Sequence, residues 1–184
     1  MSLQVPPRDP RPLPGEPLSL DLLNTRWNSG GSPRDLLDSV AGLAAWLEFN
    51  GLADRAGADR ATLDALLTAR AAIGRLVDDR DDPQARTALN AVLAHGWIDR
   101  RLGPDGPVDQ VRTDDPGWLP AWQAAADYLR LLAEAPERIR SCAHPDCVLH
   151  FHDISKNGTR RWCSMASCGN RAKASRHYAR GKPS

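Results

Sequence analysis

Several features are missing from this sequence of 184 residues, and each absence narrows what the protein can do. No apolar run approaches the length of a membrane-spanning helix, so we expect no membrane partner. The first 17 residues lack the apolar core of a secretory signal, which favours a cytoplasmic protein. No nucleophile motif or phosphate-binding loop arranges Ser, His and Asp for catalysis, so we do not expect an enzyme.

Cysteine is also absent from the first 141 residues, and all four cysteines lie in the last quarter of the chain. Their spacing is C-x4-C-x15-C-x4-C, at Cys142, Cys147, Cys163 and Cys168. In a reducing compartment, closely grouped cysteines are more often metal ligands than disulfides. Two cysteine pairs separated by a hairpin-length segment can converge on one tetrahedral ion. The spacing therefore predicts one structural Zn²⁺, with four independent buried thiols or two disulfides as the alternatives.

Four histidines lie near these cysteines, and one of them could replace a thiol as a ligand. They are His144, His150, His152 and His177. We expect none to do so, because four thiolates already complete a closed site. A closed site has no open position for water, so we expect no zinc catalysis. The ion would instead stabilise a segment too small to bury a sufficient core, with a binding free energy of about 10 kcal/mol.

The formal net charge of +1 conceals a strong asymmetry along the chain. Residues 1–135 carry 14 Lys and Arg against 20 Asp and Glu. Residues 136–184 carry ten Lys and Arg against three acidic residues. A basic tail on an acidic body indicates a polyanionic partner for the tail.

Hydrophobic periodicity indicates a mainly α (α+β) protein in two parts. Residues 1–17 hold six prolines and are expected to be disordered or extended. A mainly helical domain with one β-hairpin is expected over 18–135, where it could sense a ligand or dimerise. A small treble-clef-like zinc finger is expected over 136–184. Residues 18–27 fit a short helix or a strand equally well.

Within the helical domain, the pattern predicts four longer helices and one hairpin. The helices are expected after Ser32 as far as Gly51, from 59 to 79, from Asp82 to Gly96, and from Asp115 to about 135. The hairpin is expected over 97–113, around the turn sequence "GPDG".

In the finger, the expected elements are a knuckle, a hairpin and a helix. The segment "VLHFHDI" is followed by Asn157 and Gly158, the strongest short hairpin signal, and a return strand is expected at 160–162. Ser164 is expected to cap a helix over 165–180 that holds Cys168 in its first turn.

Helical spacing gathers basic side chains of this last helix into one stripe opposite the metal, and the hairpin could extend it. Such a surface can neutralise phosphates and address bases, although a solvated basic face is the simpler alternative. The candidate nucleic-acid-binding residues are Lys156, Arg160, Arg161, Asn170, Lys173, Arg176, His177 and Arg180. Arg171 falls nearer the metal face, where it could donate a hydrogen bond to hairpin carbonyls or to a zinc thiolate.

The motif "CGNR" at Cys168–Arg171, with "NGTRRWCSM" before it and "AKASRHYAR" after it, resembles the bacterial CGNR zinc-finger family. The segment "LDLLNTRW" at Leu20–Trp27 is similar to the N-terminal signature of the ABATE-type domain that precedes the finger in that family. The resemblance implies a stress-responsive transcription regulator that binds DNA. It also implies that the four zinc cysteines are those named above.

The leading hypothesis is a cytoplasmic, zinc-dependent DNA-binding regulator whose helical domain senses a small-molecule effector or forms a homodimer. A protein-interaction module or an RNA-binding module with a purely structural zinc site is the alternative. A small-molecule pocket could include Asp21, Asn24, Thr25 and Arg26. The simpler interpretation of those four residues is a helix cap with surface charges.

Overall fold

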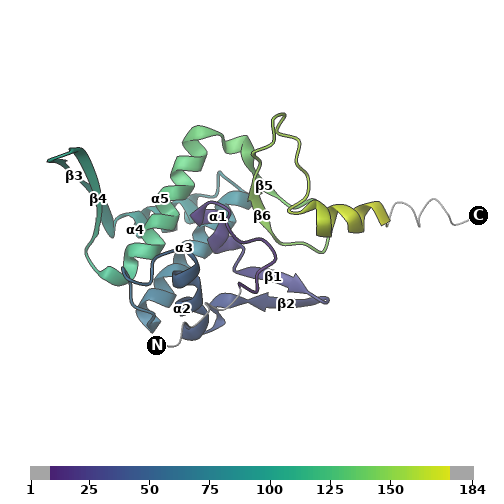
Figure 1. Cartoon of the computed structure of the whole chain (residues 1–184), viewed down its shortest axis with the longest axis horizontal. Coiled ribbons are helices and arrows are strands. Elements are labelled where there is room, and N and C mark those ends of the chain that lie inside the picture. Colours follow the sequence, from purple (N-terminus) through teal and green to yellow (C-terminus); the bar gives the residue numbers. More distant parts are fainter. Residues whose placement is uncertain (1–8, 175–184) are drawn as a thin grey trace, which may run out of the picture.

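The computed structural model describes residues 9–174, in which a helical body carries a small finger at one end (Figure 1). The helices are α1 (Leu18–Leu23), α2 (Val40–Phe49), α3 (Arg60–Asp78), α4 (Pro83–Leu93) and α5 (Leu119–Glu134). The strands form antiparallel pairs: β1 (Arg26–Ser29) with β2 (Ser32–Asp35), β3 (Gly96–Gly103) with β4 (Gly106–Thr113), and β5 (Ile139–Ser141) with β6 (His150–His152). Single turns are η1 (Leu36–Asp38), η2 (Pro116–Trp118), η3 (Pro136–Arg138) and the π-helical η4 (Met165–Gly169). The predicted mainly α fold class with small hairpins is confirmed.

Side-chain caps fix where several helices begin. The Asp59 carboxylate accepts a hydrogen bond from the Thr62 backbone N–H at 2.8 Å, which satisfies a donor at the start of α3. Asp82 does the same for the first turn of α4, where Pro83 occupies the first helical position. Helices α3 and α4 therefore begin where the sequence predicts them.

The helix predicted to start after Ser32 is wrong at its beginning. Gly30 and Gly31 have φ of 58° and 81°, values that favour glycine, and they turn the chain into the hairpin β1–β2. Helix α2 starts only at Val40, where the Ser39 hydroxyl accepts from the Gly42 N–H at 3.2 Å. The helical part of the chain thus holds two hairpins, β1–β2 and β3–β4, whereas the sequence predicts one.

The predicted hairpin over 97–113 is present as β3–β4, and it projects from the body at the end opposite the finger (Figure 1). Gly106 turns the chain with a φ of 124°. Four side chains of the hairpin are more than half exposed although they are apolar: Trp97, Ile98, Leu102 and Val108.

Helix α3 lies at the centre of the main hydrophobic core and packs against α1, α4 and α5. Leu66 and Ile73 of α3 are fully buried there, as is Trp46 of α2. Ile139 of β5 belongs to the same core although it opens the finger. Over the described residues, no helix has the length and apolarity that crossing a membrane requires.

Candidate metal centre and basic surface

The four cysteines come from two tight turns that the backbone holds together. Cys142 directly follows β5, and its N–H donates to the Leu149 carbonyl at 2.9 Å. Cys147 closes a turn by donating its N–H to the His144 carbonyl at 3.0 Å. Cys163 lies in the loop before η4, and Cys168 lies in η4 itself.

The geometry of the four sulfurs fits a tetrahedral metal ion. All four Sγ atoms lie within 4.8 Å of one another. The Sγ of Cys163 lies 3.7 Å from that of Cys147 and 3.6 Å from that of Cys168. A tetrahedron with Zn–S bonds of about 2.3 Å has edges of about 3.8 Å, whereas a disulfide needs about 2 Å. The cluster therefore has the dimensions of a zinc site and those of no disulfide.

Hydrogen-bond donors around the sulfurs favour their ionised form. The Cys163 N–H points at the Sγ of Cys142 at 3.4 Å, and the Nη2 of Arg171 donates to the Sγ of Cys168 at 3.0 Å. The Arg171 contact is of the kind that the sequence analysis expected. A hydrogen bond from Cys163 lowers the pKa of the Cys147 thiol to about 5. Donating this hydrogen bond to Cys147 raises the pKa of Cys163, and burial and repulsion by the Cys147 thiolate act in the same direction. A dication removes that repulsion and lets all four ionise.

Three of the four cysteines are buried, and Cys147 is partly buried. The candidate group contains no histidine among the described residues. His144 uses its Nδ1 to accept from the Asp146 N–H at 3.2 Å, and His177 lies outside the described residues. The site therefore supports one structural Zn²⁺, as predicted from the spacing.

The predicted hairpin around Asn157 and Gly158 is wrong, because residues 160–162 form no strand. Instead, β6 forms an antiparallel pair with β5, which precedes it in the chain, and Ile139 lies opposite His152. The buried carboxylate of Asp153 accounts for the difference. It accepts from the Ser155 and Arg160 N–H groups, both at 2.9 Å, and so folds the segment into a loop around itself.

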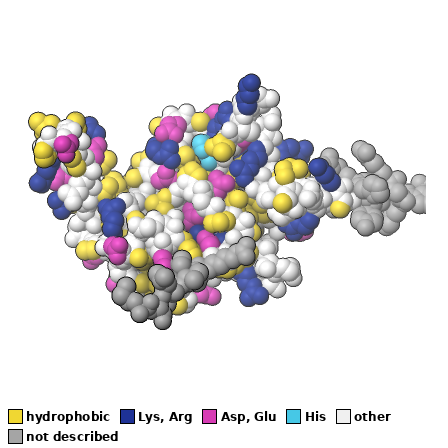
Figure 2. Space-filling view, viewed as in Figure 1, with side chains coloured by type: hydrophobic (Ala, Val, Ile, Leu, Met, Phe, Trp, Pro, Cys, Tyr) yellow, Lys and Arg dark blue, Asp and Glu magenta, His cyan; other side chains and the backbone are white. Residues whose placement is uncertain are grey.

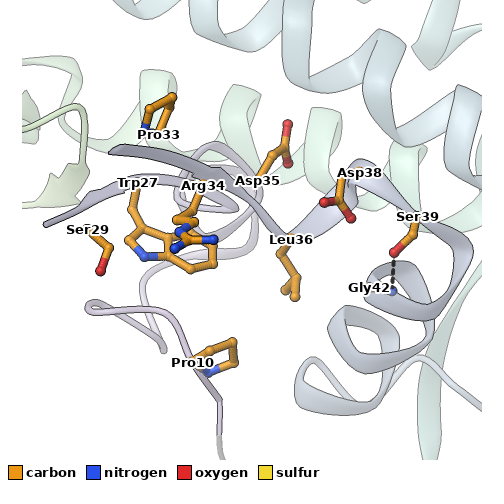
Figure 3. Close-up of a pocket in the computed structure, with 10 residues that line it drawn as sticks. All are labelled: Pro10, Trp27, Ser29, Pro33, Arg34, Asp35, Leu36, Asp38, Ser39 and Gly42. Carbon is orange, nitrogen blue, oxygen red and sulfur yellow. Dashed lines mark hydrogen bonds between the residues drawn. The ribbon is translucent and has the colours of Figure 1, made fainter. Parts of the chain in front are cut away.

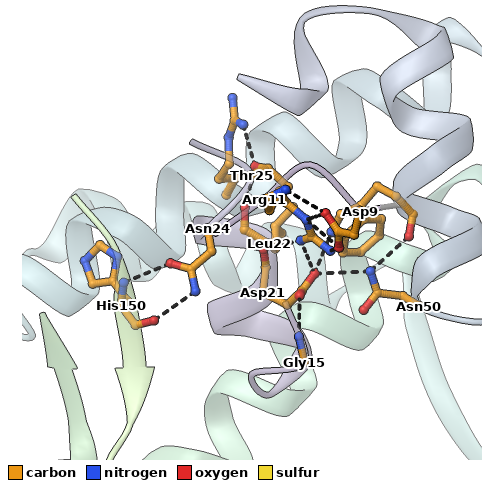
Figure 4. Close-up of polar contacts among 11 residues, drawn as sticks. Asp9, Arg11, Gly15, Asp21, Leu22, Asn24, Thr25, Asn50 and His150 are labelled. Carbon is orange, nitrogen blue, oxygen red and sulfur yellow. Dashed lines mark hydrogen bonds and ion pairs between the residues drawn. The ribbon is translucent and has the colours of Figure 1, made fainter. Parts of the chain in front are cut away.

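The finger is attached to the helical body through the free edge of β6 (Figure 4). The Asn24 amide donates to the His150 carbonyl at 2.9 Å and accepts from the His150 N–H at 2.8 Å. The Glu16 carboxylate accepts from the His152 N–H at 2.9 Å. Together these side chains complete the backbone hydrogen bonding of β6 in the way that a neighbouring strand would.

The remaining residues of the suggested small-molecule pocket have structural partners. Asp21 is buried and accepts from the Trp46 indole N–H at 2.9 Å and from Arg11 at 2.6 Å (Figure 4). The Thr25 hydroxyl accepts from Arg70 at 2.8 Å. Arg26 is the exposed member of the suggested set, and it lines a cavity. Arg11 belongs to the proline-rich lead-in, which is therefore fixed by a buried ion pair from residue 9 onward.

Three of the candidate nucleic-acid-binding cations are exposed on the finger: Lys156, Arg161 and Lys173. Arg161 lies with its guanidinium 5.4 Å from the centre of the Trp162 ring. Lys and Arg side chains are visible around the finger in Figure 2. Asn170 is exposed and its Nδ2 donates to the Ala166 carbonyl at 3.3 Å. Arg176, His177 and Arg180 lie outside the described residues.

Arg160 is partly buried and makes several contacts within the structure. Its Nε donates to the Trp162 carbonyl at 3.0 Å and its Nη2 donates to the Cys163 carbonyl at 2.5 Å. The guanidinium also lies 4.1 Å from the centre of the Phe151 ring. Its Nη2 also lies 3.5 Å from the Glu16 carboxylate, so the side chain links the loop that carries Cys163 to the segment before α1.

Comparison with known families gives two matches, one after the other along the chain. Residues 16–135 match the ABATE model, described as "Putative stress-induced transcription regulator". Residues 138–181 match the model of the CGNR zinc finger. No curated protein matches the sequence.

Proposed function

The chain belongs to the ABATE family and carries a C-terminal CGNR zinc finger, and from this premise we propose that it is a DNA-binding regulator of transcription. Zinc stabilises the finger, and the cations of the finger contact DNA. The helical part binds an effector or a second copy of the chain. The activity is regulatory and not enzymatic, and it takes place in the cytoplasm. The domain boundaries in this proposal are those expected from the sequence, 18–135 and 136–184.

The observation that carries the proposal is the state of the basic side chains on the finger. Lys156, Arg161 and Lys173 are exposed, and none of them forms an ion pair with another described residue. Cations that braced the acidic helical body would be paired with its carboxylates instead. Unpaired cations on a surface fixed by a metal are available to phosphates.

Arg160 and Arg171 are left out of this contact surface. Arg160 is occupied by carbonyls of its own loop, and Arg171 is occupied by the Cys168 thiolate. Both therefore affect DNA binding only indirectly: Arg160 fixes the loop, and Arg171 fixes the zinc ligand Cys168. Asn170, Arg176, His177 and Arg180 remain proposed contacts, which would extend the surface along the last helix.

The salt dependence of DNA affinity tests the proposal. Each phosphate contact contributes a slope of about −0.9 to a plot of log affinity against log salt. We expect a slope between about −3 and −6 for the wild-type chain with duplex DNA. The triple variant Lys156→Gln, Arg161→Gln, Lys173→Gln should reduce the magnitude of that slope by about 3.

A matched control removes three exposed cations from the helical body, as Arg55→Gln, Arg60→Gln and Arg86→Gln. It changes the total charge equally and should leave the slope as it is. A wild-type slope near zero, or an equal loss in both triple variants, would contradict DNA contact by the finger. Competition by structured RNA that exceeds competition by duplex DNA would favour the RNA-binding alternative.

A further inference from the structure

A cavity of about 860 Å³ lies where the helical body meets the finger. One wall is the face of the hairpin β1–β2 that carries Arg26 and Asp35, and another is α3 at Ala71 and Gly74. The finger closes it with Val148 and His150. The volume is in the range of small-molecule sites, and the boundary between two structural units is a usual place for them.

The apolar part of the wall comes from both units. Leu23 and Ala71 of the helical body and Val148 of the finger all line the cavity. No bulky side chain stands at Gly74, which leaves the middle of α3 open to a ligand. A body of a few carbon atoms or one aromatic ring could therefore bury its surface here.

The polar end of the cavity has an excess positive charge. The Asp35 carboxylate binds two guanidinium groups: Arg70 through two hydrogen bonds of 2.7 and 2.8 Å, and Arg26 through its Nε at 3.1 Å. One negative charge therefore faces two positive charges. Arg70 is held rigidly, because Thr25 also accepts from it, but the Nη groups of Arg26 have no partner among the described residues.

The finger contributes His150 to the wall of the cavity. The Nδ1 atom of His150 is buried and makes no hydrogen bond within the described part of the chain. The backbone N–H and carbonyl of His150 both form hydrogen bonds with the Asn24 amide, and these bonds fix the position of the residue. The Nδ1 atom does not face the cavity, so the His150 ring contributes a fixed wall against which an apolar body can pack.

We propose that this cavity binds a small amphipathic monocarboxylate, with the carboxylate on Arg26 and the apolar body reaching past Ala71 to His150. A dianion fits less well, because the two further cations of the lining, Arg34 and Arg75, are balanced by Asp38 and Asp78, which leaves an excess of one positive charge. The ligand would contact the helical body and the finger together. Its binding would therefore couple the two units, and it would give the regulator an effector site.

A second pocket, of about 630 Å³, adjoins the same hairpin and shares with the first Trp27, Pro33, Arg34, Asp35 and Asp38 (Figure 3). Trp27 and Arg34 point into it, while Asp35 points away from it. No residue of the finger lines that pocket, so occupancy there would not join the two units. It serves as the internal comparison for the proposed site.

Titration of the zinc-loaded full chain with 3-phenylpropionate tests the proposal. The readouts are the ring nitrogen resonances of His150 in ¹⁵N-histidine-labelled protein and the midpoint of thermal unfolding. We expect saturable shifts at His150 with a Kd of about 1 mM or lower, and a raised midpoint. The neutral amide 3-phenylpropionamide should bind about tenfold more weakly, because it lacks the charge that Arg26 pairs with.

Two variants separate the site from general binding. Ala71→Trp fills the cavity from the exposed side of α3 and should abolish the shifts. Arg26→Gln should weaken binding about fivefold or more, and it is safe for folding because 65% of the Arg26 side chain is exposed. The matched controls are Ala61→Trp on the same helix and Arg60→Gln, neither of which lines the cavity.

The proposal is overturned if wild-type protein shows no saturable shift at His150 with 3-phenylpropionate. It is equally overturned if Ala71→Trp binds as well as Ala61→Trp does. The assay contains no DNA, so failure here leaves the proposed regulatory function standing, and failure of DNA binding leaves this site standing.

Discussion

The helical body and the finger are held together by different forces. The body has a continuous core of buried side chains in which α3 is surrounded by three other helices. The finger has a small cluster in which three of the five buried members are cysteines: Cys142, Leu149, Phe151, Cys163 and Cys168. Burial of apolar surface can stabilise the body, whereas the finger depends on its ion and on its neighbour.

This difference in stabilisation indicates which unit can expose its surface to a partner. A segment with so few apolar side chains can expose most of its surface to a partner, because it does not need that surface for a core. The body meets the finger through the polar contacts of Asn24 and Glu16 with β6 and through apolar contacts, since Ile139 joins the core of the body and Trp27 packs against the cluster of the finger. The polar contacts are directional, so they fix the orientation of the finger without burying its basic face.

Removing zinc should give the largest effect and should act on one unit only. Chelation, or Cys163→Ser, is expected to unfold the finger, because about 10 kcal/mol of binding free energy is lost. The far-UV circular dichroism of the helices should persist, while the amide resonances of 142–168 lose their dispersion. Ser167→Ala, an exposed change in the same turn, is the control. Loss of the helical signal together with the fold of the finger would contradict the view that the two units are stabilised by different forces.

Truncating a core residue should act on the other unit. Leu66 of α3 is fully buried, and Leu66→Ala is expected to lower the free energy of unfolding of the body by about 3 kcal/mol through cavity formation. Urea unfolding measures the loss, and zinc stoichiometry should remain one ion per chain. Release of zinc without denaturant in this variant would show that the finger borrows its stability from the core.

Cutting the attachment should produce an intermediate effect that falls on the finger. Asn24→Ala removes both hydrogen bonds to His150 and leaves two backbone groups unpaired, at a cost of about 2 kcal/mol. Faster zinc transfer to a chelator and faster amide exchange at His150 are the readouts. Asn28→Ala is the matched control, because Asn28 is exposed and donates only one hydrogen bond, to the Asp146 carbonyl. Equal effects of the two variants would argue against Asn24 as the main attachment.

Acidification should give the smallest effect, again at the attachment. Burial lowers the pKa of His150, so the folded chain takes up its proton less readily than the unfolded chain does. Stability is therefore expected to fall as pH drops below the ordinary histidine pKa of about 6.5. His150→Gln should flatten that part of the profile measured by urea unfolding between pH 7.5 and 5.5. As the control, His95→Gln changes a histidine in an ion pair with Asp114 and should leave the pH dependence of the free energy of unfolding unchanged.

Local patterns in the sequence predicted much of the fold. Asp59 and Asp82 mark helix starts by a mechanism that operates within three residues, and the structure has both helices where expected. The start after Ser32 was misjudged, because the pair Gly30 and Gly31 outweighed a serine cap and a proline. In the finger, a turn does form at Asn157 and Gly158, but no return strand follows it, because the buried Asp153 carboxylate folds the segment into a loop.

For the candidate site, the spacing of the cysteines alone indicated the zinc centre, and the position of Arg171 near Cys168 indicated its hydrogen bond. The contacts of Arg11, Glu16 and Asn24 could not be predicted. Glu16 and Asn24 meet β6 across 136 and 126 residues of sequence, and nothing local distinguishes them from surface polar groups. Arg160 looked like its neighbour Arg161 in sequence and differs from it only through the carbonyls that surround it.

By itself, the sequence determined that one end of this protein is a basic, four-cysteine unit and the other a helical body, because ligand spacing, charge and helical periodicity are local properties. Tertiary structure alone decided which strand pairs with which, which cations stay exposed, and that Arg26 and His150 share one cavity. Those outcomes depend on contacts between residues far apart in the chain. Such contacts form only when the whole polypeptide has folded, and no short pattern encodes them.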